Sequence, residues 1–161
     1  MKIIVVSDTH GSYRNFKKVM QLHRDADIVV HCGDSRDEVD RIREEYPDKR
    51  FYTVKGNCDF YKENLVGAAD FTVEGVHFWA THGHMYNVKY GMFDLDAAAR
   101  EIKADVVLFG HTHYATDVVK DGIRFFNPGS LGYGRSFGVI EVKDGQVLSN
   151  IAHLKSSGFF S

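Results

Sequence analysis

The sequence predicts an α/β fold in which two mixed β-sheets pack face to face and helices cover the outside. In the N-terminal half, short β-branched apolar runs alternate with helical patterns, which is typical of a parallel sheet with crossover helices. In the C-terminal half, turn signals separate short strand patterns, which is typical of antiparallel strands. With 161 residues the chain is long enough for one core and short for two, so we expect a single domain over residues 1–161.

The N-terminal half is expected to fold as β-α-β-α-β. Continuous apolar runs indicate strands that are buried on both faces, and apolar residues at helical spacing among charged ones indicate amphipathic helices. The expected elements are a strand at residues 2–6, a helix at 12–24, a strand at 27–32, a helix through Val39, Ile42 and Tyr46 that Pro47 ends, and a strand at 51–54.

In the C-terminal half we expect a hairpin, a helix, a buried strand and then antiparallel strands. The hairpin spans residues 71–80 around Glu74-Gly75, the helix runs through residues 92–102, and the buried strand covers 105–109. From Tyr114 onward, short strands alternate with turns at Asp121-Gly122, Asn127-Pro128-Gly129 and Asp144-Gly145, which we interpret as a run of antiparallel strands. Residues 156–161 are expected to fray.

Charge and composition exclude several classes of partner. The 22 acidic and 20 basic residues leave a net charge of −2, so nothing in the overall charge indicates binding to nucleic acid or to an anionic membrane. No apolar run is long enough for a membrane span or a signal-peptide core, so we expect no membrane association and a cytoplasmic location. Cys32 and Cys58 are too few for a disulfide scaffold and are expected to be free thiols.

Oxygen and imidazole ligands recur where the expected strands end. They occur as Asp8 and His10, Gly33-Asp34, Gly56-Asn57, His82-Gly83-His84, and Gly110-His111-Thr112-His113. The carboxyl ends of strands are where an open α/β sheet places its ligands. Carboxylate, imidazole and amide groups together suit Mn, Fe, Ni or Zn better than Mg or Ca. The sequence therefore predicts a metal centre at this edge.

The number of candidate ligands indicates two metal ions. About four protein ligands serve one ion, so seven candidates fit two ions that share a carboxylate. If the backbone is extended at Asp8–His10 and at His111–His113, side chains two residues apart point the same way and both face the ions.

These motifs, in this order on a β-α-β-α-β frame, resemble the calcineurin-like metallophosphoesterase superfamily. The small size, Gly-Asn-Cys-Asp at 56–59 and Asn-Pro-Gly-Ser at 127–130 are similar to its compact YfcE-type phosphodiesterase branch, which includes the phosphoesterase-like subunit of retromer. The resemblance implies an α-β-β-α sandwich. It also implies that one metal is held by Asp8, His10, Asp34 and His113, and the other by Asp34, Asn57, His82 and His111, with Asp34 bridging.

The resemblance implies a hydrolase that acts on a small phosphate-ester substrate, with a preference for phosphodiesters. The cofactors would be two divalent ions, Mn first, with Ni, Fe or Zn as alternatives. A hydroxide that bridges the ions would attack phosphorus in line, since metal binding lowers the pKa of water to near 7. Compact family members often dimerise, which makes a homodimer an expectation, although no stretch of the sequence identifies an interface.

The chain departs from the family at Cys58, where most members have a histidine thought to protonate the leaving group. Cys58 and His84, next to the ligand His82, are the two candidates for this role, with Asn57 as a further candidate catalytic residue. His31, His77 and His153 match no ligand position. Two other functions stay open: a non-catalytic scaffold or interaction module with the same fold and, more remotely, a redox role for Cys58.

Overall fold

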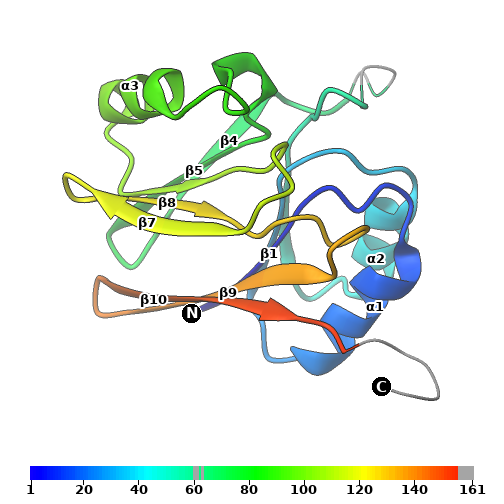
Figure 1. Ribbon diagram of the computed structural model, residues 1–161. Coiled ribbons are helices and arrows are strands. Elements are labelled where there is room, and N and C mark those ends of the chain that lie inside the picture. The colour runs from blue at the N-terminus through cyan, green and yellow to red at the C-terminus, as the bar shows by residue number, and fades with distance from the viewer. Residues whose placement is uncertain (60–61, 63, 156–161) are drawn as a thin grey trace.

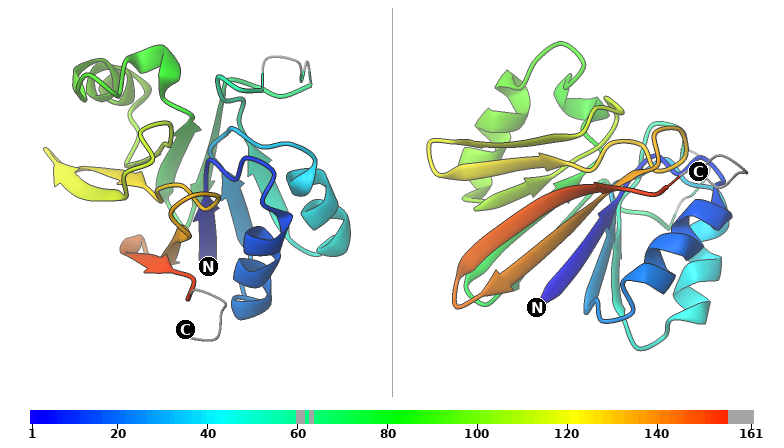
Figure 2. Two further views of the ribbon diagram at one scale, coloured as in Figure 1. Left: turned by 45° about the vertical axis from the view of Figure 1, so that its right-hand side comes forward. Right: turned by 60° about the horizontal axis from the view of Figure 1, so that its bottom comes forward.

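In the computed structural model, which describes all residues except 60–61, 63 and 156–161, two five-stranded sheets pack against each other (Figure 1). The tail that we expected to fray lies outside the described residues. The strand order is β10-β9-β1-β2-β3 in the first sheet and β4-β5-β6-β8-β7 in the second. Figure 2 shows α1 and α2 on the outer face of the first sheet and α3 on the far side of the second. The predicted α-β-β-α arrangement of two mixed sheets is confirmed.

The N-terminal half has the predicted β-α-β-α-β order. Its elements are β1 (Lys2–Val6), α1 (Tyr13–Leu22), β2 (Ile28–His31), α2 (Glu38–Glu45) and β3 (Arg50–Thr53). β1 pairs parallel with β2, and β2 pairs parallel with β3. Their carboxyl ends therefore lie at one edge of the sheet.

The C-terminal half supplies the second sheet and two strands of the first. Its elements are β4 (Ala68–Val73), β5 (Val76–Thr81), the short 3₁₀ helix η1 (His84–Tyr86), α3 (Phe93–Ile102), β6 (Val106–Leu108), β7 (Thr116–Lys120), β8 (Ile123–Asn127), β9 (Ser136–Lys143) and β10 (Gln146–His153). The expected hairpin forms between β4 and β5, and the sequence analysis did not anticipate η1.

The antiparallel strands expected after Tyr114 form as two hairpins, but these lie in different sheets and one of their strands has a parallel neighbour. β7 and β8 form an antiparallel hairpin, but β8 pairs parallel with β6. The chain then crosses to the first sheet, where β9 pairs antiparallel with both β1 and β10. Turn signals are local and show where a strand ends, whereas the pairing partner depends on tertiary packing.

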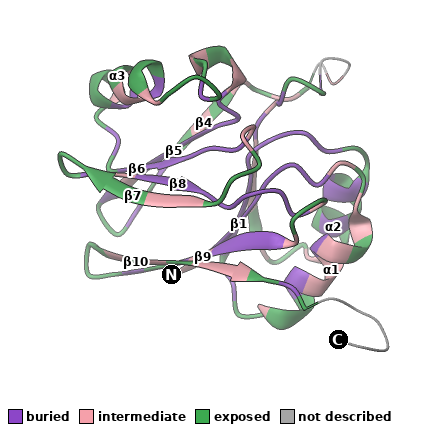
Figure 3. Cartoon of the chain, viewed as in Figure 1, coloured by how far each residue is buried: buried purple, intermediate pink, exposed green. Residues whose placement is uncertain are grey.

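Alternation along β1 divides its side chains between two layers of the core. Ile3 and Val5 pack between the sheets, in a cluster that includes Phe78 from the second sheet. Ile4 and Val6 face α1 and α2 in a second cluster. Because successive side chains on a strand point to opposite faces, only a continuous apolar run can fill both layers. Figure 3 shows β1 buried along most of its length.

The helices cover the sheets through one apolar face each. Phe16, Val19 and Met20 of α1 are buried against the first sheet. Leu95 and Ala99 of α3 are buried in a third cluster against the second sheet. In the described part of the chain, no helix combines the length and apolar character that a membrane crossing needs.

Candidate metal centre

The candidate ligands lie in loops at the carboxyl ends of five strands, as predicted. Asp8 follows β1, Asp34 follows β2, Asn57 follows β3, His82 directly follows β5, and His111 and His113 follow β6. Within each sheet these strands are parallel neighbours, so their ends come together.

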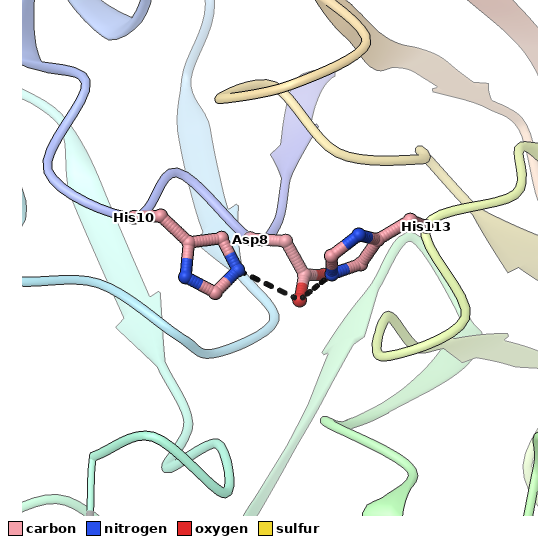
Figure 4. A group of neighbouring side chains, drawn as sticks. All are labelled: Asp8, His10 and His113. Atoms are coloured by element: carbon pink, nitrogen blue, oxygen red, sulfur yellow. Dashed lines mark ion pairs between the residues drawn. The ribbon is translucent and has the colours of Figure 1, made fainter.

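Asp8 is fully buried, and its two carboxylate oxygens have different surroundings. Oδ2 accepts hydrogen bonds from the Ser7 hydroxyl at 2.5 Å and from the backbone N–H of His111 at 3.2 Å. Oδ1 lies 3.7 Å from His10 Nε2 and 3.2 Å from His113 Nε2 (Figure 4). One oxygen is therefore fixed by the protein, and the other faces two imidazole nitrogens.

Asp34 is oriented in the same way. Its Oδ1 accepts the backbone N–H of Cys58 at 2.8 Å, and its Oδ2 lies 3.3 Å from His82 Nε2 and 3.9 Å from His10 Nε2. Burial opposes ionisation, but the interaction with the nearby His82 ring, together with the Cys58 N–H, outweighs it and lowers the pKa of Asp34. Asp34 is therefore an anion that faces histidines from both halves of the cluster.

His82 presents a nitrogen lone pair to the carboxylates. Its Nδ1 lies 2.6 Å from the carbonyl oxygen of Cys32, so Nδ1 carries a proton and donates it. In the neutral ring, Nε2 is then an acceptor that faces the oxygens of Asp34 and Asp8 at 3.3 and 3.8 Å. Backbone carbonyls orient metal-ligating histidines in this way.

Three buried polar atoms at the centre of the cluster lack a hydrogen-bond partner among the described residues: Asp8 Oδ1, His10 Nε2 and His82 Nε2. Buried polar groups in native proteins are almost always paired, and lone pairs that face one another are unfavourable. Divalent cations would satisfy all three atoms at once. The residues present therefore fit the metal ions that the sequence predicts.

The donor atoms fall into overlapping groups, and within each group they lie within 4.8 Å of one another. The groups are Asp8, His10 and His113; Asp34, His82 and His111; and His10, Asp34 and Cys58. The first two contain six of the seven candidate ligands, and Asp34 shares a group with His10 only in the third. The third adds the thiol of Cys58, which was not expected as a ligand.

The backbone at the ligands is not extended, and this expectation was wrong. Asp8 and His10 have φ of 53° and 45°, and His111 and His113 have φ of 70° and 65°. Left-handed conformations cost non-glycine residues roughly 1–2 kcal/mol each. The side chains converge because sharp turns redirect them. Strained conformations of this kind cluster at functional sites.

Asn57 and His84 lie beside the cluster. Asn57 is exposed, and its amide nitrogen lies 3.7 Å from Cys58 Sγ. The His84 ring packs 5.5 Å from that of His82 and 6.1 Å from that of His111, measured between centroids. Asn57 and His84 share a hollow of about 260 Å³ with Lys55, Gly56, Gly67 and Met85.

A larger cavity of about 740 Å³ lies beside α2 and β3, and none of its described lining residues is a candidate ligand.

The two candidate proton donors have shifted pKa values. Burial, with the nearby charge of Asp34, raises the pKa of the Cys58 thiol. Burial and the charge of His82 lower the pKa of His84. At neutral pH Cys58 is therefore a protonated but weak acid, and His84 is mainly uncharged.

The sequence analysis did not identify Asp59 as a site residue. It is fully buried and accepts backbone N–H groups from Asp34 at 2.8 Å, Ser35 at 3.1 Å and Gly56 at 2.9 Å. It therefore ties the loop after β2 to the loop after β3. The available signal was a carboxylate at the end of Gly-Asn-Cys-Asp, directly after two candidate functional residues.

Residues 127–130 form hydrogen bonds with the loops that follow β1 and β6. The amide of Asn127 donates to the carbonyl of Gly110 at 3.1 Å, and the hydroxyl of Ser130 donates to the carbonyl of Asp8 at 2.8 Å. The segment connects β8 to β9, where the sequence predicts a turn, and it contacts the loops that carry the candidate ligands.

The histidines that match no ligand position lie elsewhere. His31 is buried and bonded to Gly33 and Thr9, with its pKa lowered to about 3 by burial and by His82. His77 lies on β5 and contacts Asp70 and Lys103, and His153 is exposed on β10. Cys32 is a buried thiol whose pKa is raised by burial.

Metal binding to the Asp34, His82 and His111 group is expected to release a proton. Burial alone would lower the pKa of His82, but the facing carboxylates of Asp34 and Asp8 raise it, so in the metal-free chain the ring takes up a second proton, at Nε2, more readily than an ordinary histidine. Burial and His82 lower the pKa of His111 to about 4, so His111 is already neutral at neutral pH. Apparent metal affinity should therefore rise as the pH rises through the pKa of His82.

Calorimetric titration of the metal-free protein with MnCl₂, in two buffers of different ionisation enthalpy, measures this proton directly. We expect proton release on metal binding at this group, and the amount released should increase as the pH is lowered toward the pKa of His82. The conservative variant His82→Gln removes the titrating group and should remove the buffer dependence. A heat of binding that is the same in both buffers for the parent protein contradicts the prediction.

Comparison with known proteins agrees with this geometry. Residues 1–145 match the calcineurin-like phosphoesterase superfamily domain. The chain is 34% identical to the probable metallophosphoesterase YsnB of Bacillus subtilis over 136 residues, covering 81% of this chain and 75% of YsnB. It is 30% identical to the phosphodiesterase YfcE of Escherichia coli K12 over an alignment 179 positions long, covering 94% and 92% of the two chains.

Among solved structures, Vps29 from Entamoeba histolytica in complex with Zn²⁺ superposes with a TM-score of 0.76 at 20% identity, covering 95% of this chain and 99% of Vps29. At that identity the likeness concerns the fold. The family match and the two relatives carry the assignment, and the chain belongs to the calcineurin-like phosphoesterase superfamily.

Proposed function

We propose that the protein is a binuclear metal-dependent phosphoesterase that hydrolyses phosphodiesters, with Mn as the preferred metal. The observation that carries the proposal is the pair of fixed carboxylates, Asp8 and Asp34, whose free oxygens face the nitrogens of four histidines where the two sheets meet. Mixed carboxylate and imidazole ligands suit Mn, Fe, Ni or Zn. The likeness to the phosphodiesterase YfcE supports the diester preference.

Each half of the cluster has a role in the proposed reaction. Bound divalent ions supply the positive charge that attracts a phosphate ester, and they lower the pKa of water so that hydroxide is available at neutral pH. Asp8, His10 and His113 would hold one ion, and His82, His111 and Asn57 the other, with Asp34 shared between them. The amide of Asn57 is exposed and can also donate a hydrogen bond to a phosphoryl oxygen.

Protonation of the leaving group is the weak step of the proposed mechanism. Cys58 is protonated at neutral pH but is a weak acid because its pKa is raised. His84 is mainly uncharged because its pKa is lowered. A general acid works best when its pKa lies near the working pH. The chain therefore depends on metal binding for good leaving groups and lacks strong acid catalysis for poor ones.

A steep dependence of rate on leaving-group basicity is the expected result. A series of aryl methyl phosphates that differ only in the pKa of the phenol would show it. Cys58→His places an imidazole where most family members have one, and it should flatten the dependence by speeding the esters of the most basic phenols. His84→Ala tests the second candidate proton donor. If the rate of the parent protein already shows little dependence on leaving-group pKa, the hypothesis of weak acid catalysis is refuted.

The direct test of function is turnover of matched esters by metal-stripped protein refilled with Mn²⁺. Bis(4-nitrophenyl) phosphate and 4-nitrophenyl phosphate release the same product and differ in the second ester group. We expect metal-dependent turnover of the diester. His113→Ala should reduce it by at least about 100-fold, because even the outer partners of metal ligands contribute 10- to 100-fold. The matched control is His153→Ala, which replaces an exposed histidine on β10 and should leave the turnover of the diester unchanged.

The alternative function is a non-catalytic scaffold. The fold likeness to Vps29 makes this class relevant, but all seven ligand positions carry ligand-type side chains in this chain. If neither ester is turned over while two metal ions are bound, the scaffold becomes the better explanation.

A further inference from the structure

Tyr133 is an exposed aromatic residue that contacts the metal centre. Its ring stacks on that of His10, with centroids 4.9 Å apart and an interplanar angle of 24°, and it lies 5.7 Å from the ring of His113. Even so, the residue is 71% exposed. A large aromatic side chain that is held in place but left open to solvent offers apolar surface to a ligand.

The backbone fixes the place of this ring. The N–H of Tyr133 donates to the Ser130 hydroxyl oxygen at 3.1 Å, and the Ser130 hydroxyl donates to the carbonyl of Asp8 at 2.8 Å. The N–H of Gly132 also donates to that carbonyl, at 3.2 Å. A side chain at Gly132 would come within 2.5 Å of the carbonyl oxygen of Thr9, so the segment lies directly against the loop that carries the ligands. The ring is therefore positioned without being buried.

The position of Tyr133 favours contact with the ester group that stays on phosphorus. The leaving group must lie within reach of a proton donor, and here we take His84 as that donor. The other candidate, Cys58, groups with His10 and Asp34. The described ring contacts of Tyr133 are with His10 and His113, whereas those of His84 are with His82 and His111. Tyr133 and His84 thus lie against different histidines of the cluster.

We propose that Tyr133 is a stacking platform for a planar ring in the retained ester group, so that aryl and nucleoside phosphodiesters are the preferred substrate class. This inference rests on the proposed phosphodiesterase function. Stacking on an aromatic side chain tolerates any base, because every base has a π-face. The platform therefore selects for a ring and does not read the identity of a nucleobase.

The test uses three diesters that all release 4-nitrophenolate and differ only in the second ester group, which is methyl, phenyl or 5′-thymidyl. In Mn²⁺-loaded Tyr133→Ala, we expect kcat/KM for the phenyl and thymidyl esters to fall by about 5- to 150-fold, the range that corresponds to losing one base–aromatic stack, mainly through KM. For the methyl ester, kcat/KM should fall by about threefold or less, because its retained ester group has no ring that could stack on Tyr133.

Two variants control this test. Tyr133→Phe keeps the ring and should stay within about twofold of the parent protein on all three esters, since stacking needs only the π-face. Tyr90→Ala removes a tyrosine that is 92% exposed and outside the cluster, and it should change none of the rates. An equal fall on all three esters in Tyr133→Ala overturns the proposal, because Tyr133 would then act only through His10.

A binding experiment separates this inference from the proposed function. If the parent protein turns over none of the three diesters, the proposed function fails, and the platform is tested by the affinity of the Mn²⁺-loaded protein for thymidine 5′-phosphate and for methyl phosphate. Tighter binding of thymidine 5′-phosphate that Tyr133→Ala abolishes supports the platform. Equal affinities in the parent protein overturn it.

Discussion

Asp34→Asn is expected to remove nearly all phosphodiester turnover and at least one bound metal ion per chain. The asparagine has the same shape and can still accept the Cys58 N–H through its carbonyl oxygen. It lacks the negative charge that faces His82 at 3.3 Å and His10 at 3.9 Å. We expect kcat/KM to fall by more than about 10³-fold, because groups one step further from the metal already contribute 10- to 100-fold. Metal content per chain and steady-state rates measure the two effects.

The matched control for this variant is Asp48→Asn, at a carboxylate that is 76% exposed and, within the described part of the chain, forms an ion pair only with Lys49. Exposed pairs of this kind contribute about 0–1 kcal/mol, so its rate and metal content should match those of the parent protein. If Asp34→Asn retains two metal ions and a rate within tenfold of the parent, Asp34 does not bridge the ions, and the ligand assignment must be revised.

The elements that the sequence predicts well are those whose pattern comes from burial on both faces. β1 and β2 fill two core layers at once, so Ile3–Val6 and Ile28–Val30 can only be continuous apolar runs. The same burial makes the strand ends easy to locate. The ligands that follow them, such as Asp8 and Asp34, were therefore placed correctly at one edge.

Features that depend on contacts between distant segments were not predictable. The parallel pairing of β8 with β6 leaves no local trace, because β8 looks the same whichever neighbour it has. The left-handed backbone at Asp8, His10, His111 and His113 is also hidden, since these residue types reach that conformation only when the surrounding structure enforces it. Asp34 and Asp59 look alike in sequence. In the structure, the Asp34 carboxylate faces His82 and His10, whereas the Asp59 carboxylate accepts backbone N–H groups, including that of Asp34.

Asp59→Asn is expected to loosen the site and lower the stability of the fold. Asp59 accepts three backbone N–H groups, two at Oδ2 from Asp34 and Gly56 and one at Oδ1 from Ser35. In asparagine one of these oxygens becomes an NH₂ group, which cannot accept, so at least one buried N–H loses its partner. Each such loss costs about 1–3 kcal/mol. For a chain of this size, 1 kcal/mol corresponds to about 2–4 °C in Tm, so we expect Tm to fall by roughly 2–12 °C.

Metal affinity distinguishes a positioning role of Asp59 from a purely structural one. Because Asp59 holds the backbone of Asp34, the Kd for Mn²⁺ should rise by about 10- to 100-fold, as for other residues that orient metal ligands, and excess Mn²⁺ should restore most of kcat. Asp105→Ala is the control, because alanine removes the acceptor, whereas asparagine would keep it through its carbonyl oxygen. Asp105 accepts the backbone N–H of His77 at 2.8 Å, just before β6, at the end of that strand away from the ligands.

The Asp105 variant should lose stability without any change in metal affinity, since the loop that holds Asp34 keeps all of its hydrogen bonds. If the two variants lose stability but bind Mn²⁺ with equal affinity, Asp59 supports the fold alone. If only Asp59→Asn weakens Mn²⁺ binding, the loop after β3 sets the position of the shared carboxylate. The strength of the metal site would then depend on a residue that touches no metal.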